Sequence, residues 1–402
     1  MLYCKTLMND FIALCAVGAE PVLTRELKLL GFKPYNRLPG RVFFTSTEAE
    51  PLLAFFKANY FLRTADRVFM LINTAKAENF DDLFDLVFSI DWHNHFPRDA
   101  RITIDKVRTY KSKLSSEHAV QSIVHKAVCD KLCKKWNMHS LPETGTRFMI
   151  RIYIENNNVY VCLDLSGEPL YRRGYRLSGG AAPMRETLAA VLIQLMQWKR
   201  KIPLHDAFCG SGTIPIEAAW YAYNIPPGIA RHFAFENFIC FEKEKIEAVL
   251  KEEKERAASE VRTDCLARIT GSDISEEAVS LSKANAERAC IIAGRELHAA
   301  GITHHIERPD FIQSDFSELE APYESGILLS NPPYGERLGS EEEAFELYKR
   351  MAEIPQHFPD WKLGFITSKK EFEKIFCKQN KDAVLKKHSL RGGNMETVLY
   401  IM

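Results

Sequence analysis

The sequence carries no net charge and has no long hydrophobic run. Its 402 residues include 53 Lys and Arg against 53 Asp and Glu, so the charge is balanced overall. No apolar stretch approaches the roughly 18 residues that a membrane helix requires. The first residues, from Met1 to Lys5, lack a signal-peptide pattern. We therefore expect a soluble, cytoplasmic protein that does not bind a membrane and is long enough for two or three domains.

The sequence also has no Cys-x-x-Cys spacing. Its ten cysteines are scattered, and Cys129 and Cys133, one helical turn apart, have no evident partners for a metal site. Scattered cysteines are typical of reduced thiols in a cytosolic protein. No metal site is predicted.

A glycine-rich turn lies between an expected short strand and an expected helix that tolerates Pro215 in its first turn. Gly210 and Gly212 let the backbone bend and let a ligand approach it, and the helix N-terminus offers free N–H groups to an anion. A dinucleotide fingerprint would have a third glycine where Pro215 or Ile216 stands. The lysine of a phosphate-binding loop is missing because Thr213 follows Gly212 directly. The turn fits a small zwitterion with a carboxylate better than a pyrophosphate.

Two acids follow later expected strands. Asp273 ends a strand that starts at Ile269, and an acid at that position typically accepts hydrogen bonds from ribose hydroxyls. Asp315 ends a third strand and is suited to accept from an adenine amine while Phe316 packs on the ring. Either acid alone is more often a helix cap or turn residue, and Asp273 before Ser275 has that appearance. The order of glycine turn and acids along successive strands favours one shared ligand site.

The segment Ser330-Asn-Pro-Pro-Tyr-Gly335 follows an apolar run that reads as a buried strand. An exocyclic amine on a nucleobase is a poor nucleophile because its lone pair is delocalised into the ring. The Asn331 side-chain oxygen and a carbonyl held by prolines can accept both amine hydrogens and localise that lone pair. The Tyr334 ring can hold the base by stacking. A simple turn is the alternative reading of these residues.

Three segments together resemble the AdoMet-dependent nucleic-acid amino-methyltransferases, namely 206–219, 271–285 and 331–339. The extended form Asn331-Pro-Pro-Tyr-Gly-Glu-Arg-Leu-Gly339 is similar to the subgroup that methylates N2 of guanine in 23S ribosomal RNA. Two further segments, 171–175 and 182–190, look like the part of that family that precedes its catalytic domain. A long insertion, 221–268, separates the first two strands and is given no role.

The resemblance implies that S-adenosyl-L-methionine is the cofactor and that Asn331, Pro332, Pro333 and Tyr334 are catalytic. The residues expected to hold the cofactor are Asp206, Phe208, Gly210, Gly212, Thr213, Asp273, Ile274, Asp315, Phe316 and Asn331. Guanine is preferred over adenine only through the resemblance at Glu336 and Arg337. Alternatives that stay open are guanine N2 in tRNA, adenine N6 in nucleic acid, a nicotinamide oxidoreductase, and a non-catalytic RNA-binding or ribosome-assembly protein.

A basic stretch lies upstream, where residues 91–135 hold ten Lys and Arg against five acids. In a chain without net charge this excess indicates a phosphate-binding face, although a solvated helix face is the alternative. Residues 111–120 resemble the RNA-binding THUMP domain, which implies an RNA partner, 23S rRNA or a ribosome precursor. The candidate RNA contacts are Arg108, Lys111, Lys113 and Lys126. Because the stretch lacks a series of interleaved aromatics, we expect contacts mainly to phosphates and shape.

The sequence therefore predicts an α/β protein with three domains. Residues 1–60 form a ferredoxin-like α+β unit and residues 61–165 a THUMP domain. Residues 166–402 form a Rossmann-like AdoMet methyltransferase domain with a mostly parallel sheet. Its last two strands, near 386–390 and 398–402, are expected as an antiparallel hairpin at the sheet edge.

Overall fold

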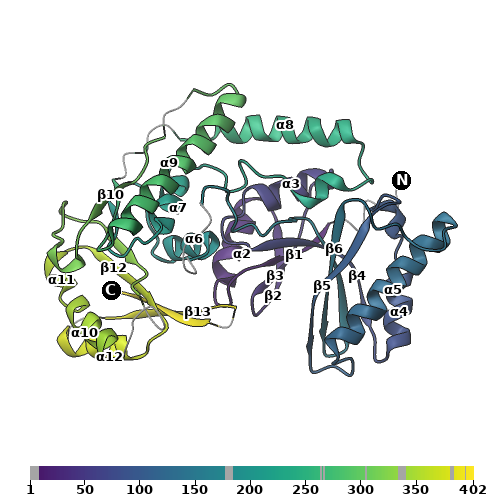
Figure 1. Cartoon of the computed structure of the whole chain (residues 1–402), viewed down its shortest axis with the longest axis horizontal. Coiled ribbons are helices and arrows are strands. Elements are labelled where there is room, and N and C mark those ends of the chain that lie inside the picture. Colours follow the sequence, from purple (N-terminus) through teal and green to yellow (C-terminus); the bar gives the residue numbers. More distant parts are fainter. Residues whose placement is uncertain are drawn as a thin grey trace.

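The chain folds around two sheets that stand at opposite ends of an elongated molecule (Figure 1). The structure is a computed structural model and describes residues 9–176, 184–262, 265, 268–303, 306–333, 341–380, 384–393 and 395–402. No helix among these residues is long and apolar enough to cross a bilayer.

The first sheet has the strand order β2-β3-β1-β4-β7-β6-β5 and is antiparallel except where β5 pairs with β6. Its strands are β1 (Asp10–Leu14), β2 (Lys33–Leu38), β3 (Arg41–Thr45), β4 (Arg67–Lys76), β5 (Arg101–Tyr110), β6 (Arg147–Glu155) and β7 (Asn158–Asp164). Alternate side chains face opposite sides, so Phe11 and Phe44 join the main core while Ile12 and Phe43 pack in a smaller one. Because β1 pairs with β4, the two units predicted before residue 165 share this sheet. The division between them at residue 60 stays a prediction.

The helices described in this part of the chain are α2 (Glu20–Leu29), α3 (Pro51–Tyr60), α4 (Phe80–Phe88) and α5 (Glu117–Trp136). Asn79 and Ser116 cap α4 and α5, each accepting a backbone N–H from three residues on. The hairpin of β6 and β7 turns at Asn156 and Asn157, whose φ angles of 51° and 63° suit a tight hairpin turn.

The second sheet has the order β10-β9-β8-β11-β12-β14-β13. Its strands are β8 (Leu204–Asp206), β9 (Ile269–Asp273), β10 (Asp310–Gln313), β11 (Ile327–Ser330), β12 (Lys362–Thr367), β13 (Lys386–Gly392) and β14 (Met395–Ile401). The first five are parallel, and β14 and β13 form the expected antiparallel edge. The order reverses at β8, and ligands of such sheets bind at that reversal, outside the carboxyl ends of the strands.

The helices of this second part are α6 (Glu186–Leu195), α7 (Thr213–Ala222), α8 (Lys243–Ser259), α9 (Glu276–Ala299), α10 (Glu341–Met351), α11 (Ile354–His357) and α12 (Glu371–Gln379). Single 3₁₀ turns are η1 (Trp92–Asn94), η2 (Ala234–Asn237) and η3 (Phe316–Glu318). Helix α9 continues as far as Ala299. Ala289, Ala293 and Leu297 recur every four residues and are buried, so the apolar stripe carries the helix on.

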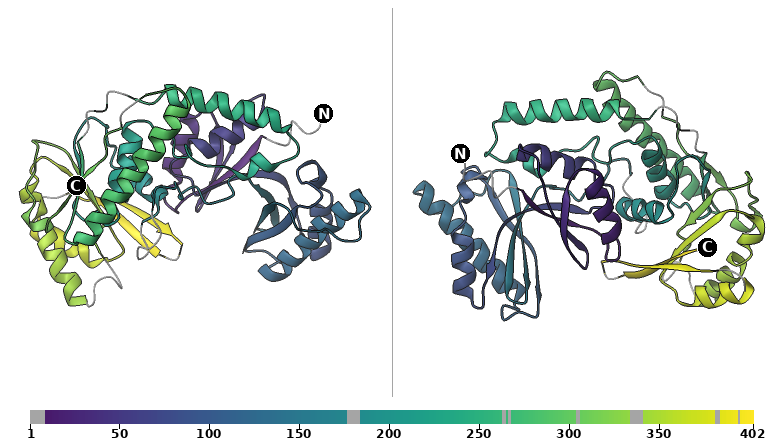
Figure 2. Two further views of the ribbon diagram at one scale, coloured as in Figure 1. Left: turned by 45° about the horizontal axis from the view of Figure 1, so that its top comes forward. Right: turned by 180° about the vertical axis from the view of Figure 1, so that it is seen from behind.

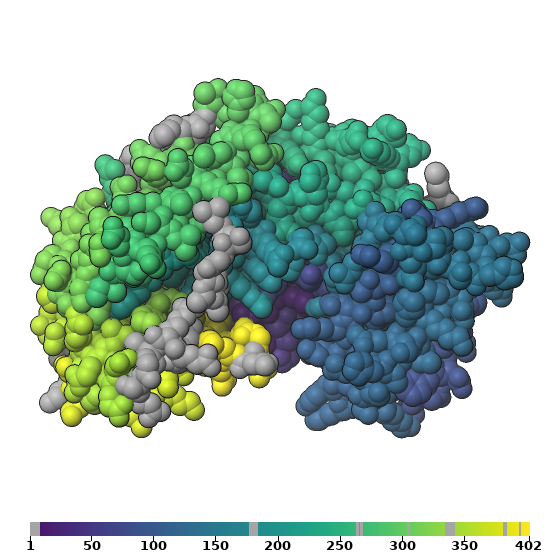
Figure 3. Space-filling model, in the orientation of Figure 1, coloured from purple at the N-terminus to yellow at the C-terminus, as the bar shows by residue number. Residues whose placement is uncertain are grey.

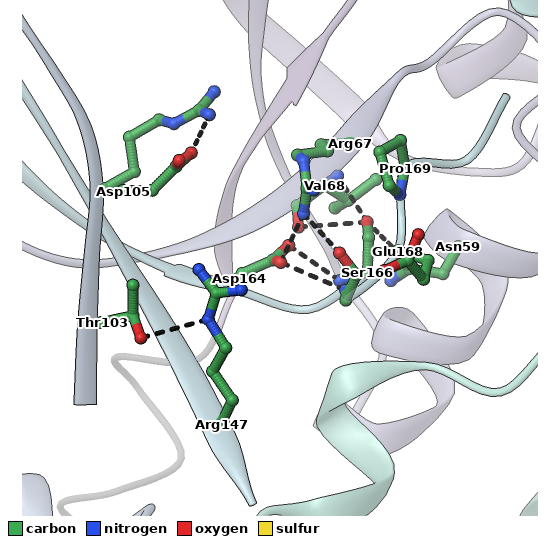
Figure 4. A network of polar contacts seen from close by, with 12 residues as sticks. Asn59, Arg67, Val68, Thr103, Asp105, Arg147, Asp164, Ser166, Glu168 and Pro169 are labelled. Atoms are coloured by element: carbon green, nitrogen blue, oxygen red, sulfur yellow. Dashed lines mark hydrogen bonds and ion pairs between the residues drawn. The ribbon is translucent and has the colours of Figure 1, made fainter. Parts of the chain in front are cut away.

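A buried polar network ties the end of β7 to β4 and α3 (Figure 4). The Asp164 carboxylate accepts from Arg67 Nη1 at 2.6 Å and from the backbone N–H of Ser166 at 3.0 Å. The Ser166 hydroxyl donates to Asn59 Oδ1 at 2.6 Å. Burial raises the pKa of Asp164 to about 6, against the opposing effect of Arg67. Arg67 therefore supplies the positive charge that offsets the burial of the Asp164 carboxylate, which would be costly if it were unpaired.

The two ends of the molecule are joined at the β13–β14 hairpin and at α8. The backbones of Val17 and Arg391 exchange two hydrogen bonds of 2.9 Å. A Cβ on Gly18 would lie 2.1 Å from the carbonyl oxygen of Ser389, so only glycine fits there. Helix α8, from the insertion between β8 and β9, packs on α3 and spans the gap between the two parts (Figure 2). These contacts give the insertion a structural role that the sequence left open.

Candidate active site

The glycine-rich turn joins β8 to α7. Gly210 and Gly212 have φ angles of +52° and +79°, a region that favours glycine. A Cβ on Gly212 would lie 2.9 Å from the Cβ of Ser282 on α9. A Cβ on Gly210 would meet none of the described residues within 4 Å. Gly212 is therefore required by the close packing of α9, whereas Gly210 leaves open space above the turn.

Asp273 at the end of β9 holds the turn in place. Its Oδ2 accepts from the backbone N–H of Gly210 at 2.9 Å, and its Oδ1 accepts from the N–H of Ser275 at 3.0 Å. Asp273 is thus a turn residue beside the glycine-rich turn, whereas the cap of the following helix is Ser275. Ile274 follows with a largely exposed side chain, and its carbonyl accepts from Gln313 Nε2 at 3.0 Å.

Asp206 at the end of β8 is buried and lies beside the motif strand β11. Its Oδ1 accepts from the Phe208 N–H at 3.1 Å. The Ser330 hydroxyl at the end of β11 accepts from the Ala207 N–H at 2.8 Å and also hydrogen bonds to Asp206. Burial is the main reason that the pKa of Asp206 is raised to about 7. The carboxyl ends of β8 and β11 are therefore linked directly.

Asp315 lies just beyond β10 and is paired with a cation that the sequence did not predict. Its Oδ1 accepts from the Ser317 N–H at 3.0 Å and from Arg350 Nη2 at 2.7 Å. Partial burial raises the pKa of this carboxyl, but the bonds from Arg350 and Ser317 outweigh it and lower the pKa overall. Phe316 is only 6% exposed, with its ring 4.9 Å from that of Phe208. The contacts of Asp315 and Phe316 with adenine stay predictions.

Asn331 follows β11 directly and has a buried oxygen without a hydrogen-bond partner. Within the described ranges, no donor reaches Asn331 Oδ1. Pro332 is buried and Pro333 half-buried beside it. An unmatched buried acceptor typically costs about 1–3 kcal/mol, so this oxygen is suited to take a donor from a ligand. Tyr334 lies outside the described residues.

A pocket of about 400 Å³ opens at the carboxyl end of β12, the strand beside β11. The hydroxyls of Tyr348 and Thr367 lie 3.1 Å apart and hold α10 against that strand end. The pocket therefore lies at the same sheet edge as Asn331. Its main lining residues are Glu342, Phe345, Glu346, Tyr348, Lys369 and Glu371.

Three residues that support the turn were not singled out from the sequence. Arg176 donates to Thr213 Oγ1 at 3.0 Å, Asn285 on α9 donates to the Ser211 carbonyl at 3.0 Å, and Ser330 links the two strand ends. Asn285 is buried, and a buried amide among apolar helix positions was a signal that the sequence offered. The partner of each lies far away in the chain, so its role needed the fold.

These residues fit an AdoMet molecule. The open space above Gly210 admits a ligand to the backbone, and the α7 N-terminus can receive its carboxylate. Asp273 and Asp315 lie at the ends of successive parallel strands, where a ribose and a base would follow. No group of three or more metal-ligating side chains occurs among the residues with described structure. Cys15, Cys129, Cys133, Cys162, Cys209, Cys290 and Cys377 are free thiols.

The four predicted RNA contacts are exposed, with Arg108 on β5, Lys111 and Lys113 in the loop after it, and Lys126 on α5. Each already has a neighbour there. Arg108 lies 3.2 Å from Glu117, and Lys113 forms an ion pair with Glu78. Lys111 lies 5.3 Å from the centroid of Tyr110 and Lys126 lies 5.9 Å from that of Phe84. Tyr110 is 59% exposed, so one aromatic ring does stand among these charges.

Three family models match the chain. One described as "RMKL-like, methyltransferase domain" matches residues 173–399, one described as "RlmL ferredoxin-like domain" matches 10–69, and the THUMP domain matches 77–164.

Among named relatives, "Putative RNA methyltransferase YpsC" of Bacillus subtilis is 34% identical over 97% of this chain and 94% of its own length. "Ribosomal RNA large subunit methyltransferase K/L" of Shewanella amazonensis is 30% identical over 90% of this chain. The match covers 49% of that relative, so the chain spans about half the length of the K/L proteins.

Two solved structures are similar over nearly the whole chain. SMU.472, described as a methyltransferase complexed with SAH, has a TM-score of 0.81 at 31% identity and covers 98% of this chain and 97% of its own. A protein of Listeria monocytogenes described as a "predicted N6-adenine-specific DNA methylase" has a TM-score of 0.83 at 32% identity, covering 100% and 98%. These similarities confirm the predicted fold and AdoMet as the cofactor.

Proposed function

Since the chain belongs to the RMKL-like methyltransferase family, we propose that it methylates the exocyclic N2 amine of a guanine in 23S ribosomal RNA. The single observation that carries this proposal is the buried Asn331 Oδ1, which has no donor within the described part of the chain. A base amine has a hydrogen to give to such an acceptor. The neighbouring prolines keep the backbone carbonyl of Pro332 in a fixed direction beside it.

The chain's own residues prepare the amine for alkylation. Asn331 Oδ1 and the Pro332 carbonyl each accept one amine hydrogen, which localises the lone pair on nitrogen. When bound, AdoMet supplies an electrophilic methyl group on its sulfonium. The methylated nitrogen then loses one proton to solvent, so the site needs no strong general base. Stacking of the extruded base on Tyr334, the role predicted for it from the sequence, would offset the few kcal/mol that extrusion costs.

The features of the first sheet favour RNA as the substrate class. The THUMP match at residues 77–164 includes the four basic candidates Arg108, Lys111, Lys113 and Lys126. Figure 3 shows the surface hollowed between this blue region and the yellow β13–β14 hairpin, with purple N-terminal residues at the floor. A folded RNA that contacts the basic face could extend across that hollow to the catalytic edge. We also propose that the protein is cytoplasmic and that its domains span residues 1–60, 61–165 and 166–402.

Guanine is favoured over adenine by the pocket beside β12. Glu342 and Glu371 line it with carboxylates, which can accept from the N1–H of guanine, whereas adenine N1 is an acceptor. Phe345 adds a half-exposed ring for stacking. Adenine N6 is the second candidate, because a similar structure is named as an N6-adenine DNA methylase. Glu336 and Arg337, on which the sequence resemblance to the guanine subgroup rests, lie outside the described residues.

Nucleoside analysis of labelled RNA tests the proposal. The purified chain is incubated with methyl-labelled AdoMet in separate reactions that contain 23S rRNA, tRNA or single-stranded DNA. Each product is then digested to nucleosides. Label in N2-methylguanosine from 23S rRNA is the expected result. Label in N6-methyladenosine would keep the role of Asn331 and overturn guanine, and label only in tRNA would overturn the ribosomal substrate.

A further inference from the structure

A pocket of about 350 Å³ lies where the first part of the chain meets the methyltransferase part, away from the catalytic edge. Its walls come from α2, the segment after α3, and the ends of α6 and α7. Tyr221 in the last turn of α7 lines it, whereas the glycine-rich turn precedes the first residue of that helix. At 1.5 Å per residue, the two sites are about 12 Å apart along the helix axis. The charged lining residues are Arg25, Glu26, Arg63 and Arg200.

Two guanidinium groups in this pocket share one aromatic ring. Arg200 lies 4.2 Å and Arg63 lies 5.6 Å from the centroid of Tyr221. Arg63 is only 7% exposed and donates through Nη2 to the Ile225 carbonyl at 2.7 Å. The Nη1 atoms of both arginines are buried, and no acceptor for either occurs among the described residues. Unmatched N–H groups on adjacent like charges are unfavourable unless an anion joins them.

Neighbouring charges leave an excess of positive charge in the pocket. Burial lowers the pKa of Arg63 to about 10, and Arg200 acts in the same direction while Glu217 and Glu26 oppose it. Glu26 is the only acid among the described lining residues, and its oxygens already accept from Thr64 and from the Gln194 amide.

The backbone is also held in an unusual conformation here. Gln197 and Arg200 have φ angles of +56° and +63°, in the left-handed region, and both line the pocket. Such conformations are unfavourable for residues other than glycine and gather at ligand clamps. They bring Arg200 over Tyr221 at the rim, while Lys199, the adjacent residue, stays exposed outside the pocket.

We propose that this pocket binds a phosphate group, either as inorganic phosphate or on a small phosphorylated metabolite, with Arg63 and Arg200 as its principal ligands and Arg25 at its edge. Planar guanidinium groups match the oxygens of phosphate in pairs. Because α2 and α7 belong to different parts of the chain, the bound anion would hold those parts together. The site is separate from the proposed RNA methylation and does not depend on it.

Thermal unfolding of the full chain measures this binding. Inorganic phosphate and a nucleoside 5′-monophosphate are each titrated against chloride at equal ionic strength, with calorimetric titration below the unfolding temperature as a second measurement. Both should raise the Tm above the chloride series if the phosphate group itself is recognised. A response to the monophosphate alone would identify a nucleotide as the source of the phosphate.

Arg200→Gln is the test variant, because its side chain is half-buried at the rim, and Lys199→Gln is the matched control for the loss of one charge. Arg200→Gln should weaken phosphate binding by roughly tenfold or more, while Lys199→Gln should leave it unchanged. AdoMet affinity, measured in parallel, should be equal in all three proteins. An equal phosphate response in the two variants, or no response in the wild type, would overturn the proposal.

Discussion

The catalytic edge of the second sheet and the basic face of the first sheet differ in how exposed their polar side chains are. At the catalytic edge, Asp206 and Asp273 accept backbone N–H bonds from the turn that would hold the cofactor. On the basic face, Arg108 and Lys113 are exposed and lie in ion pairs with Glu117 and Glu78.

This difference governs what a single substitution can do. When a buried group with several fixed partners is removed, water cannot take its place. The full free energy of its hydrogen bonds is then lost. An exposed cation in a surface ion pair contributes about 0–1 kcal/mol, and its neighbours or counterions can take its place. Changes at the catalytic edge should therefore have large, specific effects, whereas changes on the basic face should be small, cumulative and dependent on salt.

Asn331→Ala should have the largest effect. It removes the buried oxygen at the end of β11 that would accept an amine hydrogen during reaction. We expect kcat to fall by roughly a hundredfold or more while the AdoMet dissociation constant changes only a few fold. Single-turnover kinetics and calorimetry separate the two. An equal loss in kcat and in cofactor affinity would mean that Asn331 acts through the cofactor site and not on the amine.

Asp273→Ala should weaken AdoMet binding by roughly ten- to a hundredfold. It removes the acceptor of the Gly210 N–H and of the predicted ribose contact, each typically worth about 1–3 kcal/mol when buried. Calorimetric titration measures the change. Asp310→Ala, an exposed acid on the adjacent strand β10, is the matched control and should bind AdoMet as the wild type does. Similar losses in both variants would contradict a specific contact.

Gly212→Ala tests how tightly the turn is packed, and Gly301→Ala is its control. The φ angles are nearly equal, +79° and +77°, but a Cβ at 301 meets none of the described residues within 4 Å. A Cβ at 212 lies 2.9 Å from Ser282 and 3.0 Å from the Phe311 ring. We expect the variant at 212 to lose about 1–3 kcal/mol more of its free energy of unfolding than the control. Urea unfolding compares them, and equal losses would mean that conformation alone matters.

The double variant Lys111→Glu/Lys113→Glu tests the exposed side of the comparison. RNA affinity should fall several fold, and the slope of log K against log salt should become shallower by about 0.7 to 0.9 for each lost phosphate contact. Lys243→Glu/Lys251→Glu, two exposed positions on α8, is the charge-matched control. A loss of affinity without a change in the slope would point instead to base stacking by Tyr110, which is 59% exposed beside Lys111.

The stability of the fold should also depend on pH. Burial raises the pKa of Asp206 from its usual 3.8 to about 7. Between those values the folded state retains a proton that the unfolded chain has lost, so the contribution of this carboxyl to stability is full below about pH 4 and is lost as the pH rises through about 7. Asp206→Asn cannot titrate, so its Tm should fall less than that of the wild type over this range.

The matched control for this prediction is Asp310→Asn, which removes an exposed carboxyl. Its Tm should change with pH as steeply as that of the wild type. Thermal unfolding in buffers of constant ionic strength is the measurement. Burial also raises the pKa values of Asp164 and Glu186, to about 6 and about 7. These two groups should therefore keep part of the pH dependence of Tm in every variant. A wild-type Tm that does not change over this range would contradict the assignment.

The sequence alone determined the local structure and its order along the chain. Caps at Asn79 and Ser116 and the turn at Asn156 follow from contacts within a few residues. Such contacts leave a pattern that can be read directly. The succession of the glycine turn, Asp273, Asp315 and Asn331 at strand ends then predicted the sheet edge where they meet.

Only the tertiary structure decided which distant groups would meet. The pairing of Asp315 with Arg350, the link between Ser330 and Ala207, and the two arginines over Tyr221 join residues 21 to 158 positions apart. No local pattern encodes them, because such contacts depend on how whole helices and strands pack. The same holds for Asn331, since its place after a buried strand was readable, but its lack of a donor within the described residues depends on every neighbour in the fold.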